Sequence, residues 1–274
     1  MTTLPDRPRP RPRPTFHPVT VVETRDLTPH LRRVVFAGDT LDSYTNDGPS
    51  THCKLAVSPD SAADVAPPRV TSDGVQWPED RPRPVLRTYT PRVVDPAAKR
   101  LAIDFALHPD GGPATRWAAA SRPGQQVVVS GGRGAYRIDP AAPWTVLAAD
   151  ETSLPAAGTI LEAAPAGARV LLLGEVADSA EELGFDTLAS LQVTWLHRGA
   201  APGRAGRLAA QAIRELSLPA GDGNFWICLE ATAMREARRY LLHERGVGRE
   251  RLHTRGYWKL GEVDHPDHDS GDEV

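Results

Sequence analysis

A change in hydrophobic pattern near residue 142 constrains the fold of this 274-residue chain more than any other feature. Before it, from about residue 15, short runs rich in β-branched residues alternate with Pro and Gly turns, which is typical of antiparallel strands. After it, nearly continuous apolar runs alternate with helical segments. Such runs suit strands that are buried on both faces of a parallel sheet. The sequence therefore predicts two domains that meet near residues 141–143.

The first region contains six strand-like runs at short spacing. They are HPVTVVETRDL, LRRVVFAG, HCKLAVS, VLRTYTPRVV, KRLAIDFALH and QQVVVSGG. One helix is expected at residues 114–121, directly after a Gly-Gly-Pro turn. Several short strands with tight turns favour a closed antiparallel β-barrel of the Greek-key type. We expect residues 15–142 to form this barrel domain.

The second region contains four apolar runs separated by three helical patterns. The runs are WTVLAAD, RVLLLGE, LQVTWLHR and NFWICLEA. The helices are expected near residues 154–164, 208–216 and 233–245, the last with Thr232 as its N-cap and Gly246 as its stop. Strand–helix alternation indicates an open parallel α/β sheet with right-handed crossovers. We expect this sheet to occupy residues 143–262.

Both ends of the chain differ from these domains. Residues 1–14 form an arm in which Pro and Arg alternate from residue 7 to residue 14, a composition that stays extended and solvated. Residues 263–274 form an acidic tail, which we expect to be frayed. Its two His residues and two of its Asp residues offer an alternative, metal chelation, at His265, Asp267, His268 and Asp269.

Composition excludes several classes of protein. The net charge is −3, with +4 in the first 142 residues and −7 in the rest, too small an excess to indicate a nucleic-acid partner. No apolar run reaches the length of a membrane helix, and no secretory signal is recognised. Cys53 and Cys228 are too few for a disulfide scaffold or a four-thiolate iron–sulfur cluster. We expect a cytoplasmic protein.

The segment RTYTPR places an arginine and an aromatic residue on one strand face. Arg87 and Tyr89 are two residues apart and therefore project together. A guanidinium fork beside an aromatic plane suits a ligand with both a phosphate and a flat ring. Thr90 adds a hydroxyl and an amide. The alternative is an ordinary barrel strand with an exposed ion pair.

The segment HPDGGPATRWA follows a strand and opens a helix. Gly111 and Gly112 permit close backbone approach, and Pro113 suits the first helical position. Ala114 and Thr115 then present free amides at the positive end of the helix, which suits a pyrophosphate. The alternative is a plain Gly-Pro turn before a well-capped helix.

These blocks, in this order, resemble the siderophore-interacting proteins, flavin-dependent ferric-siderophore reductases of the ferredoxin-reductase-like class. The resemblance covers residues 16–261 and includes WTVLAADETSLPA and RGYWKLG. It implies that the first domain binds FAD without a covalent link. Arg87 would pair with phosphate, Tyr89 would lie against the isoalloxazine, and Thr90 would sit near its N5. His108, Gly112, Pro113, Ala114 and Thr115 would line the diphosphate and ribityl chain.

The resemblance also implies that the second domain takes NADPH or NADH. The chain has no GxGxxG fingerprint, and DETSLPA stands in its place. There Thr152 or Ser153 could cap the next helix. The candidate nucleotide-binding residues are Asp150, Thr152, Glu175 and Arg198, and plain helix caps or solvated strand ends remain alternatives. Arg198 could meet a 2′-phosphate.

A ferric siderophore is the implied substrate, and its usual negative charge requires cations. Lys54, Arg133 and Lys259 match plausible positions, with Lys259 where arginine is frequent in the family. Solvated surface lysines are the alternative. The expected function is reduction of Fe(III) in a bound siderophore by electrons from NAD(P)H through FAD, with release of Fe(II). The cofactor carries the redox chemistry, so no catalytic side chain and no resident metal are expected.

Two other functions stay open. The chain could be another flavin reductase of the same fold, with a ferredoxin, a quinone or free flavin as its partner, or a ferredoxin could replace NAD(P)H as electron donor. It could also be a carrier that binds a ferric chelate without flavin. A monomer is expected in each case.

Overall fold

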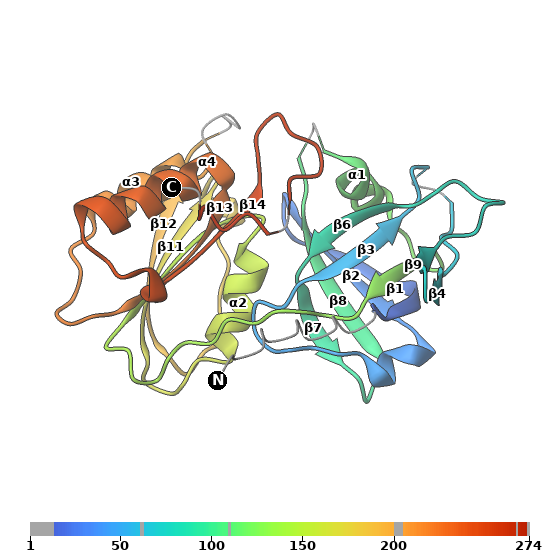
Figure 1. The fold of residues 1–274 in the computed structure, drawn as a ribbon, viewed down its shortest axis with the longest axis horizontal. Coiled ribbons are helices and arrows are strands. Elements are labelled where there is room, and N and C mark those ends of the chain that lie inside the picture. Colours follow the sequence, from blue (N-terminus) through green and yellow to red (C-terminus); the bar gives the residue numbers. More distant parts are fainter. Residues whose placement is uncertain (1–13, 61–62, 109–110, 200–204, 267, 273–274) are drawn as a thin grey trace, which may run out of the picture.

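The computed structural model describes residues 14–60, 63–108, 111–199, 205–266 and 268–272. Two sheets lie side by side, one curled and antiparallel, the other parallel and covered by helices (Figure 1). The change of pattern near residue 142 falls between them, since the first sheet ends at residue 130 and the second begins at residue 145. In the part of the chain that is described, no helix is long and apolar enough to cross a membrane.

The first sheet has seven strands in the order β6-β3-β9-β1-β2-β8-β7. The strands are β1 (Phe16–Thr28), β2 (Leu31–Ala37), β3 (Cys53–Val57), β6 (Val85–Tyr89), β7 (Pro91–Asp95), β8 (Arg100–Ala106) and β9 (Gln126–Ser130). A hairpin of β4 (Arg69–Thr71) and β5 (Gly74–Gln76), which the sequence pattern did not reveal, stands apart from it. The antiparallel prediction is thus confirmed.

The expected closed barrel is instead a curled half-barrel. No hydrogen-bonded ladder joins the edge strands β6 and β7 among the described residues, yet only Thr90 separates these two strands in the chain. The run VLRTYTPRVV, expected as one strand, therefore bends at Thr90 and connects the two edges of the sheet covalently. Pro91 follows directly, and proline cannot donate a ladder hydrogen bond, which explains the break.

Helix α1 (Pro113–Ala120) closes one end of the half-barrel with an aromatic side chain. Trp117 is fully buried and stacks on Phe36, with ring centroids 6.2 Å apart and an interplanar angle of 11°. Phe105 packs against the same indole at 5.9 Å. The C-terminal end of α1 is held by Arg32, whose guanidinium donates to the Ala119 carbonyl at 2.7 Å. The position of α1 is therefore set by the core.

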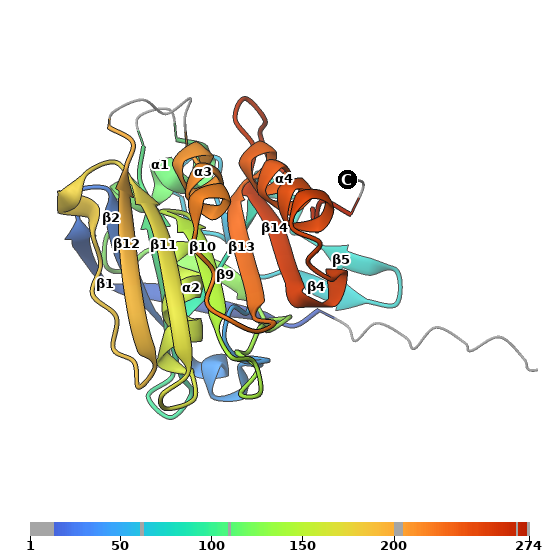
Figure 2. The same cartoon turned by 90° about the vertical axis from the view of Figure 1, so that its left-hand side faces the viewer.

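The second sheet has five parallel strands in the order β12-β11-β10-β13-β14. They are β10 (Thr145–Asp150), β11 (Arg169–Val176), β12 (Ser190–His197), β13 (Asn224–Glu230) and β14 (Leu252–Trp258). Helices α3 (Arg207–Glu215) and α4 (Ala231–Arg239) cover one face, and α2 (Leu154–Glu162) covers the face toward the half-barrel (Figures 1 and 2). The parallel α/β prediction is confirmed, with β14 as an unexpected fifth strand.

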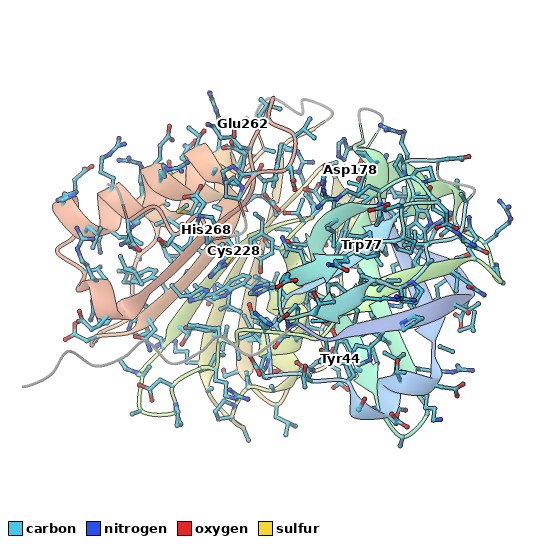
Figure 3. All side chains as sticks on the ribbon, turned by 45° about the vertical axis from the view of Figure 1, so that its right-hand side comes forward. Tyr44, Trp77, Asp178, Cys228, Glu262 and His268 are labelled. Atoms are coloured by element: carbon cyan, nitrogen blue, oxygen red, sulfur yellow. The ribbon has the colours of Figure 1, made fainter. Side chains whose placement is uncertain are left out.

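The core explains why these strands read as continuous apolar runs. Along β10, Val146 and Ala148 face α3 and α4, whereas Leu147 and Ala149 face α2, and all four are buried. Both cysteines are free and buried, and Figure 3 shows Cys228 in the interior of this domain. Each strand face has an apolar neighbour, so no polar alternation is needed.

Two of the expected helix caps are wrong. Glu230, not Thr232, is the N-cap of α4, because its carboxylate accepts from the amides of Thr232 at 2.8 Å and Ala233 at 3.1 Å. Ser153 stands at the N-cap of α2 without capping it, and its hydroxyl donates to the Cys228 carbonyl at 2.5 Å instead. The longer Glu side chain satisfies two amides at once, and the buried carbonyl of β13 takes the serine hydroxyl.

In its described residues, 263–266 and 268–272, the acidic tail is folded rather than frayed. Arg235 and Arg238 of α4 pair with Asp269 at 2.7 Å and Asp272 at 2.6 Å. The Gly256 amide of β14 donates to the Asp269 carbonyl at 2.8 Å. Pairing with helix cations and with the edge strand β14 orders these residues. Asp267 lies outside the described residues, and no group of three or more metal ligands occurs within them.

The domains meet through charged and aromatic contacts. Buried Glu181 accepts from the Thr28 hydroxyl at 2.5 Å and from the His30 amide at 3.2 Å, and so ties the second domain to the end of β1. Arg92 of β7 forms an ion pair with Glu162 of α2. These contacts fix the half-barrel against the α2 face of the parallel sheet.

Acid is expected to weaken the aromatic contact beside this interface. His253 of β14 packs against Tyr136 and Trp226, with ring centroids 5.1 Å and 6.4 Å away. Burial, and secondarily the charge of Arg255, lower the pKa of His253 to about 4. Between pH 6.5 and 4 the unfolded chain therefore binds more protons, so the free energy of unfolding falls by about 3 kcal/mol as the pH drops to 4.

Urea unfolding at several pH values between 7 and 4 measures this effect. His253→Phe should flatten the dependence, whereas His243→Phe, at an exposed position, should leave it as in the parent protein. A parent protein and His253→Phe variant with the same slope would remove His253 as the cause.

Candidate functional site

The arginine and tyrosine of RTYTPR lie on the same face of the edge strand β6, as their spacing predicts. Arg87 is opposite Leu55 and Tyr89 is opposite Cys53 in the ladder with β3, and both partners face the core of the half-barrel. The Arg87 guanidinium donates to the Leu86 carbonyl at 2.8 Å and keeps 21% of its side chain exposed. This cation lies at the rim of the sheet, where Asp264 of the loop after β14 is 3.1 Å from it.

Tyr89 connects this strand to the start of α1. Its ring packs against Phe105 at 4.5 Å, and its phenol lies near the Thr115 side chain of α1, the helix that packs against β6. Burial raises the pKa of Tyr89 to about 12, which the Thr115 contact and the charge of Arg87 oppose. The phenol therefore stays neutral. The two sequence blocks that are about 25 residues apart in the chain meet at this contact.

The turn before α1 has the geometry of an anion cradle. Gly112 is the N-cap, Pro113 begins the helix as predicted, and a Cβ built on Gly112 meets nothing within 4 Å. The first amides of a helix have no intrahelical acceptor, so those of Ala114 and Thr115 can donate to an anion there. His108 is exposed at the entrance of the turn, and Thr90 is buried at the bend after β6.

These residues fit an FAD. The Arg87 guanidinium and the open amide end of α1 suit its pyrophosphate, because both supply donors to negatively charged oxygens. The half-buried Tyr89 ring offers an aromatic surface beside them. The group would lie at the rim of the half-barrel that faces the second domain, since the loop after β14 reaches Arg87 from that side (Figure 1).

Asp150 holds the carboxyl end of β10 to that of β14. Its buried carboxylate accepts from the Thr152 amide at 2.9 Å, the Thr152 hydroxyl at 2.6 Å and the Trp258 indole at 3.0 Å. Burial raises the pKa of Asp150, and these hydrogen bonds oppose the shift. Asp150 positions Trp258, which is half-buried, whereas Thr152 is exposed.

The side chains of Glu175 and Arg198 already have partners within the protein. Glu175 is fully buried, and its two oxygens accept from the Gly206 and Ala209 amides of the α3 start at 2.7 Å and 2.9 Å. Burial raises the pKa of Glu175 to about 7. This carboxylate positions α3, a role that sequence spacing did not reveal. Arg198 pairs with Glu151 at 2.6 Å, and each side chain is 15% exposed.

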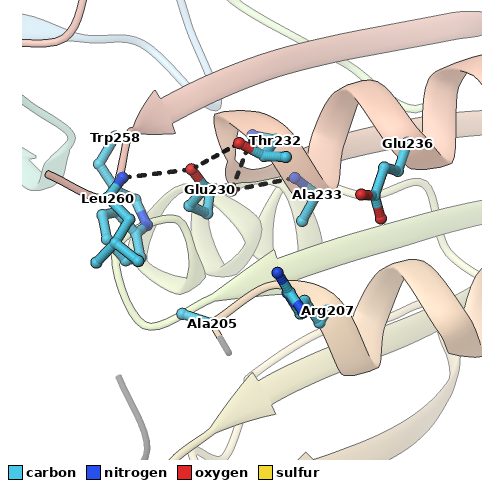
Figure 4. A pocket seen from close by; sticks show the side chains of 8 residues that line it. All are labelled: Ala205, Arg207, Glu230, Thr232, Ala233, Glu236, Trp258 and Leu260. Atoms are coloured by element: carbon cyan, nitrogen blue, oxygen red, sulfur yellow. Dashed lines mark hydrogen bonds between the residues drawn. The ribbon is translucent and has the colours of Figure 1, made fainter. Parts of the chain in front are cut away.

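A small pocket of about 80 Å³ opens where β13 and β14 end (Figure 4). Its lining residues are Ala205, Arg207, Glu230, Thr232, Ala233, Glu236, Trp258 and Leu260. Arg207, at the start of α3, points toward it. Ligands of open α/β sheets bind at the carboxyl ends of the strands, which is where this pocket lies. Sequence reasoning missed Arg207, because no motif marks it.

Two of the three basic side chains that are predicted to bind the substrate lie on one face of the first sheet. Lys54 is opposite Thr88 and donates to its hydroxyl at 2.6 Å. Arg133 forms a bridge with His52, two residues before Lys54, so both cations project from the outer face. That face is opposite to the one carrying Arg87 and Tyr89. Lys259 follows β14 in the other domain and pairs with Glu262.

Comparisons with known proteins agree with this geometry. Residues 20–136 match the model of the siderophore-interacting FAD-binding domain, and residues 142–261 match that of the siderophore-interacting protein. The chain belongs to the siderophore-interacting protein family. A relative in Escherichia coli, an NADPH-dependent ferric-chelate reductase, is 32% identical over 246 residues, covering 89% of this chain and 92% of its own.

Solved structures show the same fold. A siderophore utilization protein from T. fusca is 36% identical and superposes with a TM-score of 0.81, covering 93% of this chain and 97% of its own. The ferredoxin reductase in carbazole 1,9a-dioxygenase, 16% identical, matches with a TM-score of 0.61 over 89% of this chain and 70% of its own. This siderophore-interacting protein thus has the ferredoxin-reductase-like arrangement and an FAD-binding domain. The comparisons support a siderophore-associated flavin reductase.

Proposed function

We propose that this protein uses NADPH or NADH to reduce Fe(III) in a bound siderophore through FAD. The observation that carries the proposal is the packing of α1 against β6, which brings the amide end of the helix to the strand that carries Arg87 and Tyr89. Bound FAD would accept a hydride from the nicotinamide and pass single electrons to Fe(III). Reduction to Fe(II) weakens binding by hard oxygen donors and so releases the iron.

The side chains of the protein bind and orient the reactants in this proposal. Arg87 and the amides of Ala114 and Thr115 hold the diphosphate of FAD, with His108, Gly112 and Pro113 around it. Tyr89 supports the ring from one side, and Thr90 holds a hydroxyl at the bend nearby. Together these groups would bind and orient FAD, which would supply the redox chemistry without requiring an acid–base pair of side chains.

NAD(P)H is proposed to enter at the carboxyl ends of β10, β13 and β14. The pocket there offers the Arg207 guanidinium for a phosphate and the Trp258 indole as an apolar wall. Asp150, with Thr152, orients that indole, and Glu175 fixes the α3 start that carries Arg207. Arg198, paired with Glu151, is the second cation proposed for nucleotide phosphates.

The absorption spectrum of the purified protein, followed anaerobically, tests the proposal. We expect a yellow protein whose flavin absorption bleaches with NADPH or NADH and recovers on addition of a ferric chelate. Bleaching only with a reduced ferredoxin would identify that donor instead. Protein that stays colourless after incubation with FAD would contradict the proposal and favour a carrier.

Lys259→Ala is expected to raise the KM for an anionic ferric chelate about three- to tenfold, because the site loses a positive charge. Flavin content should not change. Steady-state reduction assays measure the KM, and Lys99→Ala serves as control because Lys99 pairs with Asp39 and Asp42 in the barrel domain. An unaltered KM in the Lys259 variant would exclude this residue from the substrate site. Lys54 and Arg133 can be tested in the same assay.

A further inference from the structure

The segment that follows β14 carries two carboxylates to two cations of the proposed site. The Glu262 amide donates back to the Lys259 carbonyl at 3.1 Å, and this turn brings the Glu262 carboxylate onto the Lys259 ammonium. Asp264, with a φ of 65°, lies 3.1 Å from the Arg87 guanidinium of the half-barrel. We name residues 262–264 the acidic loop. It neutralises one cation from each domain.

The acidic loop is held in place on both sides. Before it, the Leu260 amide donates to Glu230 at 3.3 Å (Figure 4). After it, the His265 side chain is only 7% exposed and lies between Glu262 at 3.5 Å and Asp269 at 2.8 Å. Asp269 is in turn paired with Arg235 of α4. Figure 3 shows Glu262 at the edge of the molecule where the loop rises. The carboxylate thus has a defined position.

The charge of Glu262 acts on any ligand that approaches Lys259. The ion pair with Lys259 lowers the pKa of Glu262, so the carboxylate is ionised at neutral pH. A trianionic chelate within a Debye length of this carboxylate is repelled in proportion to its charge, whereas a neutral chelate is not. Lys259 attracts the anion, and Glu262 cancels much of that attraction.

We propose that Glu262 determines substrate specificity by biasing this site toward ferric chelates with little or no net negative charge. Neutral tris-hydroxamates are then the favoured class, and trianionic tris-catecholates are disfavoured. The inference rests on the proposed function, and it names the substrate class that this function requires.

Binding of two chelates to the oxidised, FAD-loaded protein tests the inference without turnover. The probes are a hexadentate ferric tris-catecholate, which is trianionic, and a hexadentate ferric tris-hydroxamate, which is neutral. Quenching of tryptophan fluorescence gives each Kd. Glu262→Gln should lower the Kd of the trianionic chelate about three- to fivefold at low ionic strength and change that of the neutral chelate less than about twofold. Salt should reduce the difference.

Asp222→Asn is the matched control. It removes the same charge from an ion pair with Arg251. This pair lies at the amino ends of β13 and β14, whereas Glu262 follows the carboxyl end of β14. The control should leave both Kd values unchanged. Equal shifts for the two chelates in Glu262→Gln, or no shift, would overturn the inference while chelate binding itself upholds the proposed site. A parent protein that binds neither chelate would overturn the proposed function and the inference together.

Discussion

Replacing Arg87 with Ala is expected to weaken FAD binding by about ten- to a hundredfold. In the proposed site this guanidinium makes a charge-assisted contact with the cofactor phosphate, and such contacts contribute about 1.5–3 kcal/mol. The side chain is 21% exposed and lies at the rim of the sheet, so its loss leaves the core of the half-barrel unchanged. Titration of the apoprotein with FAD, followed by flavin fluorescence, gives the Kd.

Arg69→Ala provides the control for Arg87→Ala, since Arg69 is an exposed arginine on the separate β4–β5 hairpin. It should retain the parent affinity. If both variants bind FAD as the parent protein does, Arg87 is not a phosphate ligand. If both lose affinity equally, the effect is one of overall charge.

Trp117→Ala is expected to lower the free energy of unfolding of the barrel domain by about 3–5 kcal/mol. The indole is fully buried between Phe36 and Phe105, so its removal leaves a cavity that neighbouring side chains fill only in part. Since α1 carries the amides of the proposed FAD site, the variant should also bind FAD less tightly. Differential scanning calorimetry of the apoprotein measures the barrel transition.

Two further variants sharpen the Trp117 test. Trp117→Phe should retain much of the stability, because it preserves an aromatic ring against Phe36. Trp77→Ala, at a half-buried position outside the barrel core, should have a clearly smaller effect. A Trp117→Ala variant as stable as the parent protein would show that α1 is not held by this side chain.

Local patterns predicted most of the fold. The strands of both sheets other than β14, together with α1–α3, lie close to the runs that hydrophobic periodicity indicates, because burial on one face or on both leaves a signature within a few residues. The spacing of Arg87 and Tyr89 likewise predicted their common face, since strand alternation is a local rule. The hairpin β4–β5 was missed because its exposed strands of three residues leave no apolar run.

Local patterns did not reveal the polar contacts that join residues far apart in the sequence. The place of Glu175 at a strand end makes it a candidate nucleotide ligand. Its carboxylate accepts hydrogen bonds from amides at the start of α3, 31 and 34 residues later in the chain. The tail, whose composition predicts disorder, is ordered by Arg235 and Arg238 of α4.

The order of the sequence blocks and their periodicity determined by themselves that a β domain with an arginine–tyrosine strand precedes a parallel α/β domain, because these features depend on neighbouring residues alone. Only the tertiary structure decided that Thr90 joins the two edges of the half-barrel. It also decided that the Trp258 indole donates to Asp150 and that Asp264 forms an ion pair with Arg87. Pairings of this kind are set by the packing of distant segments, and no local pattern encodes which polar side chain will lie opposite which partner.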